Sequence, residues 1–185
     1  MTGMPSELIS ADEALKRLLA LAQPLEKTEL SLVDAIGHHL ATDIHARLTQ
    51  PSAPLSAMDG YALRFAELPG PFEVCGESAA GKPWLQHLPA KGAVRIFTGA
   101  VVPEGADTVA VQEDAVRNDT QVSFPKDGPA YAGAHIRPAG NDFHEGAILA
   151  HSGALVTPSL VGLAAAAGLA TLPVHRQPQV ALLST

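Results

Sequence analysis

The amino-acid sequence predicts a mixed fold that is α/β toward both ends and β-rich in the middle. Gly and Pro are plentiful, with 16 and 15 of 185 residues, whereas aromatic residues make up only 4%. This composition favours short elements joined by sharp turns. Apolar residues recur at helical spacing near both ends, and short apolar runs between Gly/Pro turns fill residues 51–140. With 46% hydrophobic residues, the chain can bury a core in one large domain or two small ones.

The N-terminal segment, residues 1–24, is expected to form an amphipathic helix. Ser10 and Glu13 have the spacing of a capping box, and Pro24 marks the end of the pattern. Apolar side chains recur between them at helical spacing, at Ala11, Ala14, Leu15, Leu18, Leu19 and Ala22.

Residues 31–48 indicate a turn followed by a strand. Ser31 and Asp34 open a short helical turn that closes near Gly37. Residues 39–48 then alternate between two faces, which predicts a half-buried strand. One face carries Leu40, Thr42, Ile44, Ala46 and Leu48.

The middle of the chain, from Pro51 to about Gly140, changes to short candidate strands separated by Gly/Pro turns. A small all-β domain fits this pattern best. The candidate strands are residues 72–75, 93–97, 108–112, 121–124 and 134–137.

Two further elements are expected after residue 140. Thr157 as N-cap and Pro158 at the first helical position predict a helix that ends at Gly168 and packs closely through its Ala-rich face. Residues 179–185, QVALLST, are typical of the first buried strand of a parallel α/β domain. Since no crossover helix follows this strand, we expect the chain to be a fragment that stops before that domain.

Charge and cysteine content exclude several classes of function. The formal net charge is -7, and no dense stripe of Lys and Arg is present, which disfavours nucleic acid and anionic membranes as partners. Cys75 is the single cysteine, so an internal disulfide cannot form. The N-terminus lacks the pattern of a signal peptide, and no apolar run is long enough to cross a bilayer. A cytoplasmic, soluble protein is expected.

Three segments carry candidate chemistry. SAMDGYA, residues 56–62, places Asp59 in a turn, and RIFTG, residues 95–99, runs from a strand into a Gly-rich loop in which Thr98 and backbone N–H groups could bind an anion. IRPAGND, residues 136–142, ends another strand with Arg137 and Asp142. From the residues alone, the first segment could be a simple turn with local hydrogen bonds at Asp59, and the third a surface turn with an exposed ion pair of little energetic value. A strand followed by Thr-Gly is by itself a weak signal.

Together, SAMDGYA, RIFTGAVVPEGADTVAVQED and IRPAGND resemble the molybdopterin molybdenumtransferases, a family that includes the corresponding domain of gephyrin. The similarity extends from Ser10 to Thr185. It implies that the intact protein is an enzyme that inserts molybdate into adenylated molybdopterin in a magnesium-dependent step, and that this fragment alone is inactive.

The resemblance also implies site residues. Asp59, Thr98 and Asp142 would be catalytic, and Ser56, Gly99 and Arg137 would bind the cofactor. Mg²⁺ commonly binds one or two carboxylates together with substrate phosphates and waters, so Asp59 and Asp142 are the expected metal ligands. Because molybdate is a dianion, Thr98, the loop N–H groups and Arg137 are the better candidates for contact with it.

We therefore expect a discontinuous α/β connector domain, residues 25–50 and 140–177, with a β-barrel-like domain of residues 51–139 inserted in it, and residues 178–185 as the first strand of a molybdopterin-binding domain. The resemblance further implies a homodimer, and molybdopterin adenylyltransferase is a possible partner. Two alternatives stay open: a non-catalytic, gephyrin-like interaction module, and a small-molecule β-domain unrelated to molybdenum, which widely separated motif loops would favour.

Overall fold

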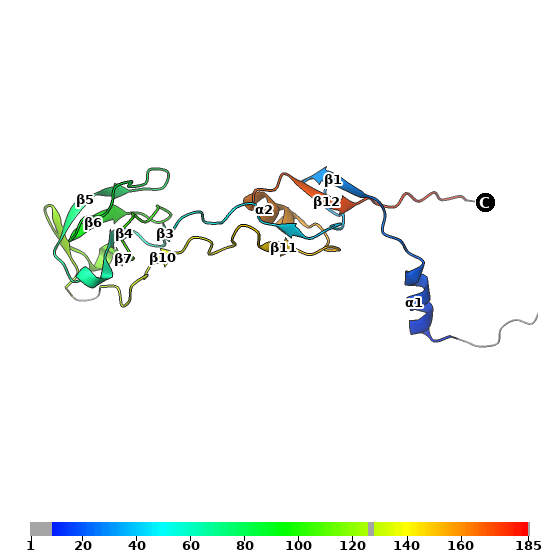
Figure 1. Cartoon of the computed structure of the whole chain (residues 1–185), viewed down its shortest axis with the longest axis horizontal. Helices are drawn as coiled ribbons and strands as arrows, with labels where there is room; N and C mark the ends of the chain where they lie inside the picture. The colour runs from blue at the N-terminus through cyan, green and yellow to red at the C-terminus, as the bar shows by residue number, and fades with distance from the viewer. Residues whose placement is uncertain (1–8, 126–127, 185) are drawn as a thin grey trace, which may run out of the picture. The chain divides into compact units, whose positions relative to one another are not determined.

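The computed structural model describes residues 9–125 and 128–184 and shows a mostly β protein with two α-helices (Figure 1). The chain divides into two compact units. Unit 1 comprises the described residues of Met1–Ile44, Ile148–Ala165 and Leu169–Thr185, and unit 2 comprises those of His45–Ala147 and Ala166–Gly168. Neither described helix has the length and apolar character needed to span a membrane.

Helix α1 (Ala11–Ala20) begins as predicted. The Glu13 N–H donates to the Ser10 hydroxyl at 3.2 Å. Acidic Asp12 and Glu13 lie in the first turn, where their negative charge interacts favourably with the positive end of the helix dipole. None of the helical residues is buried. The apolar stripe at Leu15 and Leu18 is therefore exposed, and the structure shows local stabilisation of this helix by its cap and by the ion pair of Arg17 with Glu13 at 2.7 Å.

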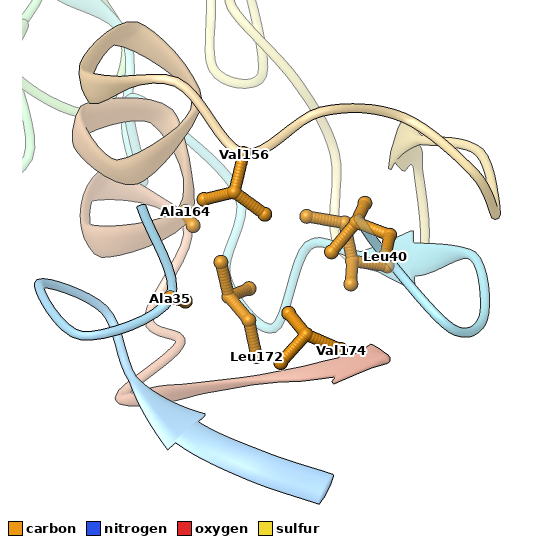
Figure 2. Close-up of a cluster of buried hydrophobic side chains, with 7 residues drawn as sticks. Ala35, Leu40, Val156, Ala164, Leu172 and Val174 are labelled. Carbon is orange, nitrogen blue, oxygen red and sulfur yellow. The ribbon is translucent and has the colours of Figure 1, made fainter. Parts of the chain in front are cut away.

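The core of unit 1 is built from residues far apart in the sequence. Strand β1 (Lys27–Ser31) pairs antiparallel with β12 (Thr171–His175), and β2 (Ile44–His45) pairs with β11 (Ile148–Ala150). Helix α2 (Pro158–Ala166) starts as predicted, with the Leu160 N–H donating to the Thr157 hydroxyl at 3.2 Å. Figure 2 shows the buried cluster, which includes Ala35, Leu40, Val156, Ala164, Leu172 and Val174.

The strands predicted at residues 39–48 and 179–185 differ from the structure. Over residues 39–48 only β2 is a strand, because the backbone changes partner along the segment: the Leu40 N–H donates to Ala154 and the Ala41 N–H to Pro173. Leu40 and Ile44 are buried as expected, but Leu48 is exposed. Residues 178–184 form no strand, since no neighbouring strand pairs with them in the described part of the chain, and Thr185 lies outside it.

Unit 2 contains a curled, half-barrel sheet of six strands in the order β7-β4-β6-β5-β9-β8 (Figure 1). Strands β5 and β6 are parallel, and the other neighbours are antiparallel. The strands are β4 (Gly60–Leu63), β5 (Phe72–Ser78), β6 (Gly92–Ile96), β7 (Thr108–Val111), β8 (Val116–Asn118) and β9 (Gln121–Ser123).

Shorter elements complete unit 2. Strand β3 (Leu55–Ser56) pairs with β10 (Ile136–Arg137), and the 3-10 helices are η1 (Phe65–Glu67) and η2 (Gln112–Asp114). All five strands predicted in this region are present, although the last shrinks from residues 134–137 to β10. Two apolar clusters, one around Phe72 and one around Ile96, form its interior.

The indole of Trp84 packs directly on the backbone of β5 in unit 2. A Cβ added at Gly76 would lie 2.2 Å from the ring, so only glycine permits this approach. The indole Nε1 is buried and has no hydrogen-bond partner in the described residues.

Candidate functional site

The three motif segments meet in unit 2 through backbone contacts. The Ser56 N–H donates to the Ala100 carbonyl at 2.9 Å, and the Gly99 N–H donates to the Ser56 carbonyl at 2.8 Å, which joins the first segment to the second. Pairing of β3 with β10 places Ser56 opposite Ile136 and so joins the first segment to the third. The motif loops are therefore adjacent, and the alternative that required them to be far apart is not favoured.

Asp59 and Thr98 form the centre of the candidate site. The Thr98 N–H and hydroxyl both donate to Asp59 Oδ1, at 2.8 and 2.9 Å. These bonds, the backbone one foremost, hold the pKa of Asp59 below its ordinary value; burial opposes this lowering, and the charge of Arg95 adds to it. The carboxylate is therefore ionised near neutral pH, and among the described residues no hydrogen bond reaches its Oδ2 atom.

The turn that presents Asp59 requires glycine at the next position. A Cβ added at Gly60 would lie 2.0 Å from the carbonyl oxygen of Ala110 on β7. The Gln112 N–H donates to the Asp59 carbonyl at 3.1 Å and so anchors the turn from the same side. Ser56 is buried, and its hydroxyl donates to the Met58 carbonyl at 2.6 Å. Its side chain thus shapes the loop and does not face solvent.

The loop at Thr98 is a tight turn in which Gly99 has φ of +80° and the Ala100 N–H donates to the Phe97 carbonyl at 2.9 Å. The sequence suggested that N–H groups of this loop could bind an anion. In the structure, the N–H groups of residues 98–100 donate to Asp59, Ser56 and Phe97. These three N–H groups are therefore already engaged within the protein and are not free to bind an anion.

Arg137 and Asp142 form a separate ion pair. One guanidinium nitrogen of Arg137 contacts both carboxylate oxygens of Asp142, and both side chains are partly exposed, at 43% and 38%. The Asp142 N–H donates to the Gln50 carbonyl at 3.0 Å. In residues 9–125 and 128–184, no hydrogen bond or ion pair links Asp142 to Asp59, and no group of three or more His, Cys, Asp and Glu could hold a metal ion.

Two residues of the site were not selected from the sequence, Arg95 and Gln112. Arg95 lies inside the RIFTG segment, where it could be noticed, but its contact with the Asp59 turn depends on the pairing of β4 and β6. Gln112 carries no local signal. A cavity of about 660 Å³ also adjoins the motif segments, and its lining includes Pro54, Trp84, Val101 and Ile136.

Comparison of this fold with solved structures and of the sequence with known families gives the class of protein to which this chain is similar. The crystal structure of the molybdopterin biosynthesis MoeA protein from Pyrococcus horikoshii OT3 matches with a TM-score of 0.81 and 27% identity, over 91% of this chain and 46% of that chain. The family described as the MoeA N-terminal region (domain I and II) matches residues 9–168. The chain belongs to this family.

Curated relatives agree with this assignment. A molybdopterin molybdenumtransferase of Haemophilus influenzae is 37% identical over 96% of this chain, and one of Bacillus subtilis is 33% identical over the same share. The chain spans less than half of their lengths, 45% and 43% respectively. Their names are those of enzymes, so the alternative of a non-catalytic interaction module is not favoured.

Proposed function

We propose that this chain forms the part of a molybdopterin molybdenumtransferase that carries Asp59 and Thr98, and that the whole enzyme inserts molybdate into adenylated molybdopterin in a Mg²⁺-dependent step. The observation that carries the proposal is the Asp59 carboxylate, fixed by two bonds from Thr98 and open at Oδ2, in a chain similar over 96% of its length to an enzyme of that name.

The Asp59 corner fits Mg²⁺. This ion prefers oxygen ligands and usually keeps several waters beside one or two carboxylates. Asp59 supplies an ionised carboxylate with an open oxygen, and the Thr98 hydroxyl oxygen lies 2.9 Å from its other oxygen. Bound there, the ion would neutralise negative charge on phosphate and oxyanion groups. Asp142 is the second proposed ligand, through water, because Arg137 already contacts its carboxylate.

The remaining site residues are proposed to bind the anionic substrates. Arg137 is the cationic side chain of the site with an exposed surface, so it is the proposed contact for molybdate or for the phosphate of the adenylated cofactor. Thr98 would orient Asp59, since its N–H and its hydroxyl both donate to that carboxylate. Gly99 would give the cofactor close access to the backbone, and Ser56 would support that loop from the interior.

We also propose the finer architecture that the family resemblance implies. Unit 1 would act as a discontinuous α/β connector domain and unit 2 as the inserted β-barrel-like domain. The natural protein would work in the cytoplasm as a homodimer and receive its substrate from a molybdopterin adenylyltransferase.

The proposal is tested by Asp59→Asn in the full natural polypeptide that carries this sequence. This change keeps the shape of the side chain but removes its charge, so molybdate insertion should fall at least about a hundredfold, and added Mg²⁺ should not restore it. Asp119→Asn is the matched control, because Asp119 lies in the β8–β9 turn at φ of +53°, which Asn tolerates. Equal activity in Asp59→Asn and wild type would reject the role of Asp59.

A further inference from the structure

The guanidinium of Arg95 has four partners within unit 2. Its Nη1 donates to the Gly60 carbonyl at 2.9 Å, and its Nη2 donates to the side-chain oxygen of Gln112. The guanidinium carbon lies 4.7 Å from the ring centroid of Phe97 and 5.3 Å from that of Tyr61, so both aromatic rings contact the cation. An Arg side chain fixed by two hydrogen bonds and two rings has little freedom left.

The partners of Arg95 are the immediate neighbours of the site residues. Gly60 follows Asp59 in the chain, and Phe97 precedes Thr98. Gln112 donates its backbone N–H to the Asp59 carbonyl. One guanidinium thus contacts the residue after Asp59, the residue before Thr98, and the residue that anchors the Asp59 carbonyl.

We propose that Arg95 is a positioning residue that holds the Asp59 turn against the Thr98 loop. The inference rests on the proposed function for its catalytic consequence, although the geometric claim can be tested without activity. Arg95 acts through Gly60, Gln112 and Phe97, and among the described residues it makes no hydrogen bond to Asp59 itself.

Lysine could not take this role. The guanidinium is planar and presents several N–H donors in a fixed fork, so one group can reach the Gly60 carbonyl and the Gln112 side chain together while its faces lie against two rings. An ammonium group is a compact point charge and would keep one of these contacts at a time. Arg95→Lys therefore retains the charge and removes the geometry.

The first test measures amide hydrogen exchange in this 185-residue chain. The Thr98 N–H, which donates to Asp59, reports the position of the loop, and the Val109 N–H, which donates to the Ala134 carbonyl at 3.1 Å, reports the rest of unit 2. In Arg95→Gln, exchange at Thr98 should rise by about tenfold relative to exchange at Val109. A structural role alone would raise both rates equally.

Arg64→Gln is the matched control. Arg64 is also half-buried in unit 2 and donates to the backbone carbonyls of Leu88 and Pro89. It follows the opposite end of β4, and no hydrogen bond or ion pair joins it to the Asp59 turn or to the loop of residues 98–100 in the described part of the chain. Its loss should leave the ratio of Thr98 to Val109 exchange unchanged. If Arg64→Gln raises this ratio as much as Arg95→Gln does, the proposal is overturned.

If Arg95→Gln does not fold, the same ratio of Thr98 to Val109 exchange is measured on Arg95→Lys. The proposal expects an exchange ratio above that of the wild type, and a ratio equal to the wild type overturns it. In the full natural polypeptide, Arg95→Lys should lower kcat more than it raises KM, because Arg137, the proposed contact for the anionic substrates, is not among the partners of Arg95. If the wild type has no activity while the Thr98 signal still changes, the proposed function fails and the positioning role stands.

Discussion

The two oxygens of Asp59 have different surroundings, and this asymmetry is the main chemical feature of the site. Oδ1 accepts both bonds from Thr98, so the side chain cannot rotate without losing them. No hydrogen bond reaches Oδ2 from the described residues. A carboxylate held in this way is preorganised, since a metal or a substrate group that binds Oδ2 need not order the side chain first.

The lowered pKa of Asp59 predicts a pH dependence of stability. Because the folded-state pKa lies below the ordinary value of 3.8, the carboxylate stabilises the fold fully above the unfolded-state pKa. That contribution is lost as the pH falls through the lowered folded-state pKa. The free energy of unfolding of the wild type should therefore fall more steeply below about pH 4 than that of Asp59→Asn. Urea unfolding across this range measures the difference, and Asp119→Asn should follow the wild type.

Gly60→Ala tests the close approach of the Asp59 turn to β7. The added Cβ would lie 2.0 Å from a backbone oxygen, so the strands must separate, and unit 2 should lose at least about 1–3 kcal/mol. The same substitution at Gly162 in α2 is the control. Nothing lies within 4 Å of its added Cβ, and Ala there should stabilise by about 0.5–1 kcal/mol. Unfolding free energies from denaturant titration check both values, and an unaffected Gly60→Ala variant would contradict the geometry.

At the scale of elements, helices α1 and α2 have similar caps but different surroundings. Ser10 caps α1, which buries none of its residues, whereas Thr157 caps α2, whose Ala164 lies in the core of unit 1. Local interactions, the cap and the Glu13–Arg17 ion pair, stabilise the first helix, and tertiary packing adds to the cap in the second.

This difference predicts different effects on the unfolding midpoint of unit 1 for two equivalent substitutions. Ser10→Ala should cost about 1 kcal/mol of helix stability, which lowers the helicity of α1 and leaves the unfolding midpoint of unit 1 unchanged. Thr157→Ala should lower that midpoint, because α2 folds together with its core. Carbon chemical shifts of residues 11–20 and a melting curve measure the two effects. A lower midpoint in Ser10→Ala would show that α1 packs against the protein in solution.

Elements with local signals could be predicted from the sequence. Both helices have a hydroxyl cap followed by apolar spacing, and the predicted strands of unit 2 are apolar runs bounded by turns. Strand β1, by contrast, reads KTELS and is formed by its partner β12, which lies more than a hundred residues away. Pairing between segments so far apart cannot be predicted from a short stretch of sequence. The same holds for residues 39–48, whose backbone partners also lie far away in the sequence.

In the candidate site, too, some features could be predicted from the sequence and others could not. Asp59 and Thr98 stood in recognisable motifs, and the structure joins them by hydrogen bonds. Their placement against Arg95 and Gln112 comes from the order β7-β4-β6, which no local pattern in the sequence specifies. The sequence could not predict that the N–H groups of residues 98–100 donate to other groups of the protein, because a Gly-rich turn has the same sequence whether its donors are free or hydrogen-bonded.

At the scale of the whole molecule, unit 2 has what an independent folding unit requires. Its six-stranded sheet encloses its own apolar clusters. The ends of the inserted segment also meet, since the Gly140 N–H donates to the Pro51 carbonyl at 2.9 Å. Ends that lie together allow a segment to be separated from its host without stretching the chain.

We therefore predict that residues 51–140 fold alone. The isolated segment should show dispersed amide signals and a single cooperative melting transition, because its core and its sheet are complete within it. Nuclear magnetic resonance and calorimetry check the two properties. A spectrum without dispersion would mean that the segment needs unit 1 to fold.

Trp84 makes unit 2 separately visible in the intact chain. It is the only tryptophan of the sequence, so indole fluorescence arises from unit 2 alone. Nearly all residues of the two described helices lie in unit 1, so the helical circular dichroism signal in the far ultraviolet comes mainly from unit 1. Two optical probes thus follow two units of one polypeptide without any label. Since the ring lies against Gly76 and lines the cavity beside the motif segments, its emission also provides a native reporter for small molecules that enter that space.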